Sequence, residues 1–464
     1  MTTRSSEVDI GEREDHSSPL VAVFITALLT AFMAAAYGFG MYLFSQLVTD
    51  MRADIGFGYA TVGVITAGGQ LGFLVFALLG AWLAARVGGG QVIVGSGALC
   101  GICLVGLPMT DSIIVIGVLL AILGGTAASV YVPMVEIVAR VITYRHRGKV
   151  LGLVSSGTSY GVVVNSLLVP YFVLNDNWRG VWYVVGFGTL AVTVIGVIAF
   201  WRLGLFRPSG GSREKAEGTS GSERSSGDRG VPLRRLLVPW VVVIWIITFL
   251  NGFSTMPFQN YLSPYLREGL GFSVDYAALV WGLIGFIGMF AGFAIGWLSD
   301  KTGVRLAMLF CYFSILLSAA LLVVAPVGPI PVISGVLFSL AFYPVFGLVP
   351  AYVAKTVDGT SATTIFGIAN VTLGVGGMAG NYAGGMLESL TGSFVWIYVM
   401  IGLTAILLAL LASRLPSEST EEGPAVRGGS EDSPAEGGAS EVSVVGTSAP
   451  KTEVPNDGPR GREE

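Results

Sequence analysis

Charge is scarce in this sequence, and its scarcity argues against an ordinary soluble protein. Only 12% of the 464 residues are Asp, Glu, Lys or Arg, whereas about 25% are charged in a typical soluble domain. Hydrophobic residues make up 53%, and the mean hydropathy is +0.73. A chain of this kind has too little polar surface to cover a core in water. The composition therefore predicts an integral membrane protein.

Histidine and cysteine are also rare, which leaves little material for a metal or redox site. His16 and His146 lack metal-ligand spacing. Cys100 and Cys103 have the spacing of a redox motif but lie inside an apolar run without a nearby His. Gly88–Gly90 lacks the Lys-Ser/Thr of a phosphate loop. We therefore expect no enzyme, no metal and no cofactor, and the net charge of −4 gives no basic footprint for nucleic acid.

Long apolar runs, by contrast, are abundant. A helix needs about 20 mostly apolar residues to cross the hydrocarbon core of a bilayer. The first run, Val21–Phe44, follows an acidic stretch, so it is interpreted as an uncleaved helix and not as a signal peptide. The sequence predicts twelve spanning helices, at 21–44, 60–85, 91–108, 113–139, 149–173, 180–202, 237–261, 276–299, 304–325, 330–354, 363–387 and 394–414.

Polar stretches divide the chain into five predicted parts. Gly, Ser and charged residues dominate both ends and one internal stretch, a composition typical of flexible segments. The parts are a disordered N-tail (1–19), a six-helix bundle (20–203), a linker (204–235), a second six-helix bundle (236–415) and a disordered acidic C-tail (416–464).

The basic residues predict how the chain is oriented. An even number of helices puts the tails, the linker and the loops after helices 2, 4, 8 and 10 on one face. That face holds 23 of the 26 Lys and Arg residues, and the other face holds only Arg52, Arg179 and Arg267. By the positive-inside rule both termini are cytoplasmic. We expect a multi-pass, monomeric protein of the plasma membrane, surrounded by membrane lipids.

The two predicted bundles repeat one pattern at a fixed offset along the chain. The offset is defined by placing Ala81–Gly88 over Gly296–Gly303. The same shift superimposes three further pairs: Arg140 and Lys355, Gly152 and Gly367, Gly161 and Gly376. A parallel repeat of six helices is a recurrent architecture of secondary transporters. The predicted fold class is therefore an all-α membrane protein of twelve transmembrane helices in two pseudo-symmetric six-helix bundles.

The loop after the eighth predicted helix resembles a family signature. Its sequence, GWLSDKTGVR from Gly296 to Arg305, resembles the loop motif of the major facilitator superfamily. Within that superfamily, Tyr144–Gly152, Asn177–Gly180 and Ala36–Gly40 are similar to the monocarboxylate and oxalate/formate porters. The motif residues are Gly296, Asp300, Lys301, Gly303 and Arg305, and the degraded first copy of the motif keeps Arg86 and Gly88.

The resemblance implies the major facilitator fold, alternating access and a gating role for this loop. Asp300 is expected to latch the cytoplasmic gate in one state, by lying near a helix N-terminus or an Arg. Lys301 and Arg305 are available to anionic head groups or to carboxylates. The alternative is that all three are ordinary charges of a cytoplasmic loop.

Deep in the predicted bundles the polar groups are uncharged. Helices 1, 4, 7 and 10 surround the cavity in the superfamily, so the resemblance favours four substrate ligands: Tyr37, Tyr131, Asn251 and Tyr343. Further candidates on neighbouring helices are Gln70, Tyr160, Asn165 and Asn370. Each is alternatively a helix–helix hydrogen bond, worth about 0.6 kcal/mol.

One ionisable residue, Glu136, falls clearly inside a predicted span, near the cytoplasmic end of the fourth helix. Charged groups at membrane depth are functional candidates by default. One interpretation is that Glu136 takes up a co-transported proton or cation. The favoured interpretation is a structural pair with Arg140, one helical turn further on.

The predicted function is secondary active transport of a small organic solute, with a monocarboxylate among the candidates. The related porters usually carry a basic residue in helices 1, 8 or 11, which these spans lack. A carboxylate is then disfavoured, unless Tyr hydroxyls and Asn amides suffice or the substrate is taken as the neutral acid. The alternatives are a drug or metabolite efflux transporter, although Ala121 replaces the helix-4 Arg of drug–proton antiporters, and a transporter-like solute receptor.

Overall fold

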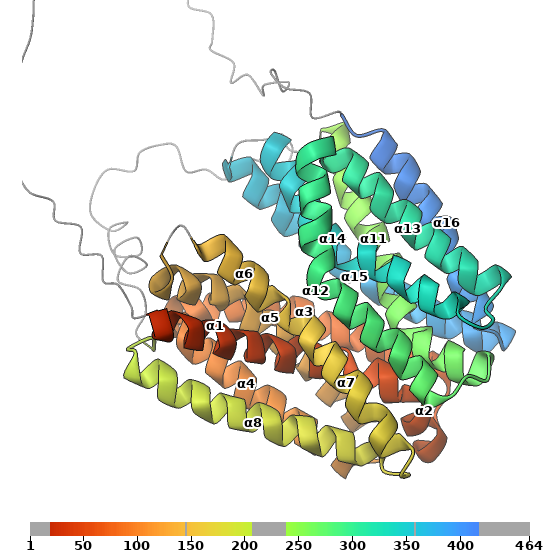
Figure 1. Cartoon of the computed structure of the whole chain (residues 1–464), viewed down its shortest axis with the longest axis horizontal. Helices are drawn as coiled ribbons and strands as arrows, with labels where there is room; N and C mark the ends of the chain where they lie inside the picture. Colours follow the sequence, from red (N-terminus) through yellow and green to blue (C-terminus); the bar gives the residue numbers. More distant parts are fainter. Residues whose placement is uncertain (1–18, 144–145, 207–237, 357–358, 417–464) are drawn as a thin grey trace, which may run out of the picture. The chain divides into compact units, whose positions relative to one another are not determined.

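The computed structural model describes residues 19–143, 146–206, 238–356 and 359–416. The predicted tails, 1–19 and 416–464, and the predicted linker, 204–235, lie almost wholly outside these residues. In the part of the chain that is described, the secondary structure is helical and contains no strand. Figure 1 shows the helices in two bundles, α1 to α8 and α11 to α16.

The first bundle contains six membrane helices, two of which are built from consecutive segments. Their bounds are α1 (Pro19–Met33), the π-helix η1 (Ala34–Phe39) and α2 (Leu43–Ile55) for the first; α3 (Tyr59–Val87); α4 (Gly89–Gly106), followed by the short η2 (Leu107–Met109); α5 (Ile113–Val141); α6 (Arg147–Ser155) and α7 (Gly157–Val173) for the fifth; and α8 (Trp178–Arg202).

The second bundle contains the other six. They are α11 (Pro239–Pro264) continued by the π-helix η5 (Tyr265–Gly269), α12 (Val274–Thr302), α13 (Val304–Val324), α14 (Ile330–Thr356), α15 (Gly359–Thr391) and α16 (Val395–Ser413). Within the described residues, eleven of the twelve are long and apolar enough to cross a membrane by composition alone. The exception is α15, a 33-residue helix rich in Gly and Thr.

The offset between the two halves reappears in the helix boundaries. The shift that places Gly88 on Gly303 also places both ends of α3 on the two ends of α12. The glycines that follow these helices, Gly88 and Gly303, have φ of 104° and 89°, with ψ of 146° and 151°. Glycine adopts this conformation at little cost, so each half turns directly into its next helix at the same point.

Small residues bring the backbones of each bundle together at matching positions. A Cβ on Gly161 of α7 would lie 2.6 Å from the carbonyl oxygen of Ala34, and one on Gly376 of α15 would lie 1.9 Å from that of Phe249. The two contacts are equivalent, because the same offset relates both of their members. Beside the first contact, Asn165 donates a 2.7 Å hydrogen bond to the carbonyl of Gly38. Packing through small residues is typical of helices in lipid, where apolar side chains gain little from leaving the bilayer.

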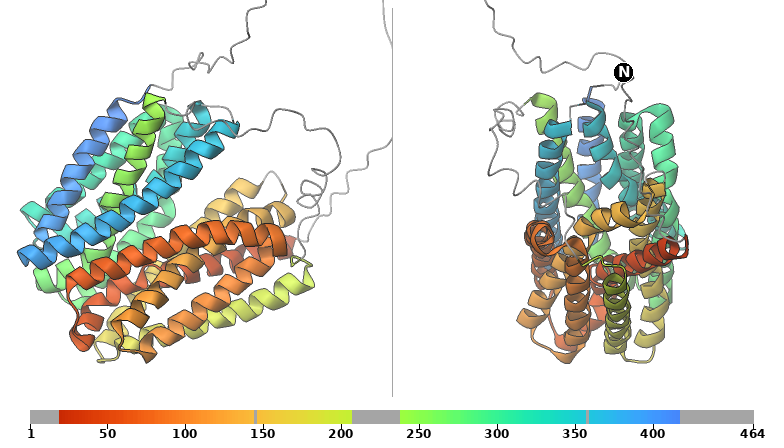
Figure 2. Two further views of the ribbon diagram at one scale, coloured as in Figure 1. Left: turned by 180° about the vertical axis from the view of Figure 1, so that it is seen from behind. Right: turned by 90° about the vertical axis from the view of Figure 1, so that its left-hand side faces the viewer.

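The two bundles meet along two equivalent seams, α3 with α15 and α12 with α7, and where α2 packs on α11. Figure 2 shows α3 and α15 side by side. We call the end with the turns 56–58 and 270–273 the outer end, and the opposite end the inner end.

Glycines on one face of α12 show where the second seam is closed. Spacings of three, seven and four residues put Gly282, Gly285, Gly292 and Gly296 on the same face. A Cβ on Gly282 would meet Ser166 at 2.8 Å, whereas one on Gly292 or Gly296 would meet nothing within 4 Å. The bundles are therefore in contact at the outer end of this seam and apart toward the inner end.

The seam between α3 and α15 shows the same contrast between its two ends. Gly367, Gly374 and Gly385 lie on one face of α15. A Cβ on Gly385 would lie 2.4 Å from the carbonyl of Tyr59, and one on Gly374 would lie 2.6 Å from Leu74, but one on Gly367 would meet nothing within 4 Å. Both seams are thus tight at the outer end and open at the inner end.

Several helices are longer than their apolar runs predict. The first membrane helix extends to Ile55 instead of Phe44, and the seventh reaches Gly269 instead of 261. The extensions carry polar and charged residues, which end the hydropathy signal without ending the helix. These predicted ends were wrong for that reason.

The backbone contact at Gly161 is expected to be a principal determinant of stability. Gly161→Val forces α7 away from η1, and overpacking of this kind costs about 1–3 kcal/mol. The measurement is the thermal unfolding midpoint of purified protein in detergent. Gly152→Val is the matched control, because a Cβ at Gly152 would meet nothing within 4 Å. Equal midpoints for the two variants would contradict the packing described here.

Candidate functional site

A pocket lies between the first membrane helix, α3, α5 and α11. Its cavity volume is about 40 Å³, and it is partly open to solvent. All the residues that line it are uncharged: Gly40, Met41, Phe44, Ile65, Thr66, Gly69, Gln70, Leu120, Gly124 and Asn260. Since α11 belongs to the second bundle and the other helices to the first, the pocket is formed by both halves of the chain.

Two side-chain amides provide most of the polarity of this pocket. Thr66 already donates to the carbonyl of Val62 in its own helix. The Gln70 side chain is only 7% exposed, and its amide nitrogen donates to the thioether sulfur of Met256 at 3.3 Å. Asn260 donates to the side-chain oxygen of Asn381 on α15 at 3.0 Å.

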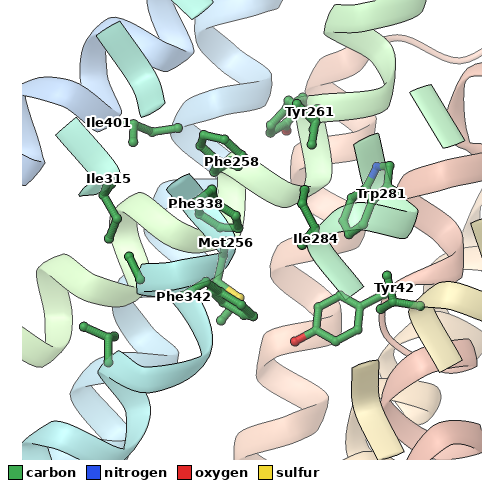
Figure 3. Close-up of a cluster of buried hydrophobic side chains, with 14 of the residues drawn as sticks. Tyr42, Met256, Phe258, Tyr261, Trp281, Ile284, Ile315, Phe338, Phe342 and Ile401 are labelled. Carbon is green, nitrogen blue, oxygen red and sulfur yellow. The ribbon is translucent and has the colours of Figure 1, made fainter. Parts of the chain in front are cut away.

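Beyond Met256 the surroundings become apolar and aromatic. Figure 3 shows Met256 beside Phe342, with the ring of Tyr42 facing them from the first bundle. The rings of Tyr42 and Phe342 make an edge-on contact, with centroids 6.5 Å apart. The polar groups on α3 and α11 thus border an apolar region shared by the two halves.

Of the eight predicted cavity ligands, Gln70 is the one that lines this pocket. Tyr37 and Tyr131 contact each other edge-on at 6.4 Å, and Tyr131 is 46% exposed. The ring of Tyr343 would lie 2.1 Å from a Cβ on Gly288 of α12. These three tyrosines remain predicted ligands, outside the pocket in this conformation.

The other four predicted ligands, three asparagines and Tyr160, also lie outside the pocket. Asn165 and Asn251 are fully buried within their own bundles, where Asn251 donates to the hydroxyl of Tyr312 at 3.3 Å. Tyr160 and Asn370 are exposed. Sequence reasoning missed Asn260, because the face that an amide presents depends on the rotation of its helix and not on composition.

At the outer end, two ion pairs join the bundles. Arg267 of η5 donates two hydrogen bonds to Asp50 of α2, at 2.6 and 2.8 Å, and both side chains are 15% exposed. Arg52 of α2 donates to Glu268 at 2.5 Å. Bidentate Arg–carboxylate pairs are among the stronger and more directional polar contacts in proteins.

Aromatic rings complete this closure. The hydroxyl of Tyr59 donates to Glu268 at 2.6 Å. Its ring packs edge-on against Phe394 at 4.8 Å, and the guanidinium of Arg52 lies 4.5 Å from the ring centroid. We call this set the outer gate: Asp50, Arg52, Tyr59, Arg267, Glu268 and Phe394.

The outer gate was not predicted, although a signal for it exists. The offset between the halves places Arg52 on Arg267, so the two are equivalent in the repeat, and each pairs with an acid of the opposite half. They were passed over because the predicted helices ended before them. The third outer arginine, Arg179, differs, because it pairs with Asp54 and Asp111 inside the first bundle.

The predicted inner-end motif is arranged differently. Asp300 is exposed and makes no ion pair with any residue that the structure describes. Lys301 lies 4.0 Å from the ring centroid of Trp297, and at the equivalent position Arg86 lies 4.0 Å from that of Trp82. The latch assigned to Asp300 stays a prediction, since this conformation holds the inner seams open.

The remaining inner-end residues make contacts within their own bundles. Arg305 donates to the carbonyl of Ser413 at the end of α16. Glu136 and Arg140 form an ion pair with 3.9 Å between their atoms, and both are partly exposed. The distance fits the pairing expected from the sequence, whereas the role of the pair stays a prediction.

Known proteins share the sequence features of this chain. The sequence profile of the Major Facilitator Superfamily matches residues 30–381. A probable sulfoacetate transporter from Cupriavidus necator is 24% identical over 374 residues, which cover 76% of this chain and 84% of that protein. Monocarboxylate transporter 12 of Rattus norvegicus is 22% identical over 304 residues, which cover 61% of this chain and 62% of that protein.

The fold has a counterpart among solved structures. The crystal structure of a D-xylose-proton symporter superimposes with a TM-score of 0.68 at 15% identity, covering 86% of this chain and 99% of that one. The predicted fold class is thereby confirmed. With a profile match over three quarters of its length, the chain belongs to the Major Facilitator Superfamily, as a multi-pass membrane protein that performs secondary transport of small solutes.

Proposed function

We propose that the protein transports small organic acids across the plasma membrane by alternating access, and that the conformation described here is open toward the cytoplasm. The observation that carries the proposal is the contrast between the two ends of the seams. Both are closed at the outer end, where the outer gate joins the halves, and both are open at the inner end. A pathway between two rocking halves has this form in one of its end states.

The distribution of charge supports this orientation. The inner end carries nine described Lys and Arg residues, at Arg86, Arg140, Arg147, Lys149, Arg202, Lys301, Arg305, Lys355 and Arg414. The outer end carries Arg52, Arg179 and Arg267. The positive-inside rule then makes the inner end, and with it both termini, cytoplasmic. Because both halves of the pathway come from one chain, a single copy suffices for transport.

The substrate class is supported by the relatives and by the pocket together. The bacterial relative is described as a probable sulfoacetate transporter and the rat relative as a monocarboxylate transporter. The pocket of this chain is small, and its two amides border an apolar region that suits a short carbon skeleton. A large cationic drug is less well matched, because the lining offers no acid.

Uptake into proteoliposomes tests the substrate class. Labelled short carboxylic acids are expected to accumulate at rates well above those of sugars, amino acids and cationic dyes, because amide groups bordering an apolar wall favour compact acids. Protein-free vesicles measure leakage. Transport of dyes or sugars without any transport of acids would contradict the proposal. Saturable binding without flux of any solute would favour a receptor instead.

Loss of the outer gate is expected to expose the cavity to the outside. Removing a partly exposed ion pair costs up to about 1 kcal/mol, which shifts the conformational equilibrium about fivefold. Thr49 is 9% exposed and lies beside Asp50 on α2. In an Arg267→Ala background, a cysteine introduced by Thr49→Cys is therefore expected to react about fivefold faster with an impermeant external maleimide. The native cysteines, Cys100, Cys103 and Cys311, are buried and contribute little background.

Arg179→Ala is the matched control for this experiment, because both of its ion pairs lie within the first bundle. It removes an outer arginine without cutting a link between the halves, so the labelling rate of Thr49→Cys is expected to stay unchanged. Equal acceleration by both arginine variants would show that surface charge, and not the outer gate, controls access.

A further inference from the structure

One face of α12 carries a row of large exposed side chains along the inner half of the helix. The members recur every three or four residues, so they share one face. They are Phe286, Phe290, Phe293, Trp297 and, at the inner end, Lys301. The four apolar side chains are between 55% and 84% exposed. A continuous apolar surface of this kind is rare in water, but it suits a helix face in contact with lipid.

The same row is present on α3, in the first half of the chain. The offset between the halves places five residues on the members of the α12 row: Leu71, Val75, Leu78, Trp82 and Arg86. The four apolar side chains are between 49% and 73% exposed. We call the two sets the α3 row and the α12 row. Each row ends in a Trp and, one turn later, a cation, so the chain presents two equivalent surfaces.

The α12 row faces away from the neighbouring helices. A Cβ on Gly288 would meet Tyr343 of α14, whereas one on Gly282 or Gly285 would meet α7. Phe286 directly follows a seam glycine, as Phe293 and Trp297 do, and one residue is a rotation of about 100°. The row is therefore turned away from α7 and lies opposite the face that contacts α14. The repeat gives the α3 row the equivalent orientation.

The length of each row fits one leaflet of a bilayer. From Leu71 to Trp82 a helix rises about 16 Å, and half of the hydrocarbon core measures about 15 Å. Trp is enriched at the level where hydrocarbon meets head groups. Arg86 and Lys301 lie one turn further, in the last turns of α3 and α12. Each row thus sets apolar side chains beside acyl chains and a cation at the level of the head groups.

The two cations have charge that the protein leaves uncompensated. Arg86 and Lys301 each lie 4.0 Å from the ring centroid of the Trp one turn before. Neither forms an ion pair with any residue in the described part of the chain. A cation–π contact holds the position of a cation without neutralising its charge. Arg305, which the sequence also offered to head groups, instead donates to the carbonyl of Ser413.

We infer that each row binds one anionic phospholipid from the leaflet at the inner end, with the phosphate on Arg86 or Lys301 and an acyl chain along the apolar side chains. A zwitterionic head group is bound less well, because its own cation offsets the attraction of its phosphate. The α3 row is expected to bind more tightly, since Ala85 stands where α12 carries Asp300 beside its cation. This binding is independent of which solute is transported.

Native mass spectrometry of the whole chain in a neutral detergent counts the bound lipids. The probe is phosphatidylglycerol, and phosphatidylcholine of the same chain length is the comparison. Two molecules of phosphatidylglycerol are expected to stay on each protein, and no phosphatidylcholine. Inorganic phosphate at the same concentration is expected not to displace them, because it has no acyl chain. Equal retention of the two lipids, retention of neither, or displacement by phosphate overturns the inference.

Substitution of the cations assigns the two lipids to the two rows. Arg86→Gln and Lys301→Gln are each expected to weaken one binding step about fivefold, the effect of one basic residue near anionic lipid. The double variant is expected to weaken both steps, and Arg86→Lys is expected to retain binding. Lys149→Gln is the matched control, because it removes an exposed lysine of the inner end that has no Trp one turn away. Equal weakening by Lys149→Gln means that total charge binds the lipid, and overturns the inference.

Substitution of a Trp tests where the head group lies. Trp82→Leu keeps an apolar side chain but removes the ring beneath Arg86, so the affinity for phosphatidylglycerol is expected to fall about threefold. Trp201→Leu is the control, since Trp201 is exposed at the inner end of α8 and belongs to neither row. Both variants are expected to keep the unfolding midpoint of the unaltered protein in lipid-free detergent, because the side chains are exposed. An affinity that Trp82→Leu leaves unchanged, or that Trp201→Leu lowers equally, overturns the assignment of the head group to the row.

Discussion

In a lipid bilayer, each backbone N–H and C=O group must find its partner within the protein, and this requirement shapes the whole chain. It makes the described residues helical, since a helix satisfies its own backbone. It also changes how helices associate, because lipid offers apolar side chains nearly the same environment as a protein core. Association then depends on close backbone approach, as at Gly161 over Ala34 and Gly376 over Phe249. The seams between the halves use glycines in the same way, so they can close at one end and open at the other.

The chain places its polar groups asymmetrically on a symmetric scaffold. The backbone follows the repeat down to the conformation of Gly88 and Gly303. The two arginines of the outer gate follow it as well, and each crosses to the opposite half. The pocket does not follow it, since Gln70 corresponds to Gly285 in the second half. The symmetric scaffold thus suits a rocking movement of the two halves. The asymmetric placement of Gln70 makes one wall of the pocket different from the other.

Scarcity of charge has a functional consequence as well as a structural one. A cavity lined by neutral amides and apolar side chains avoids the free energy needed to hold ions in a medium of low polarity. Within the described residues, the charged side chains are found mainly at the two ends of the bundles, where water reaches them. There they link the halves at the outer end, and the basic residues gather at the inner end.

The sequence by itself determined the number of membrane helices, the two-bundle organisation and the family, because hydropathy and a fixed repeat offset are properties of composition and order. It also singled out Gln70, which lines the pocket, since an amide in an apolar run is unusual wherever the run packs. Only the tertiary structure decided that Asn260 joins it and that Asp50 meets Arg267. It also decided that Asn165 and Asn251 donate their hydrogen bonds within their own bundles. These facts depend on helix rotation and on polar helix extensions, for which hydropathy carries no signal. They also depend on contacts between residues far apart in the sequence, which form only when the helices and the two halves pack.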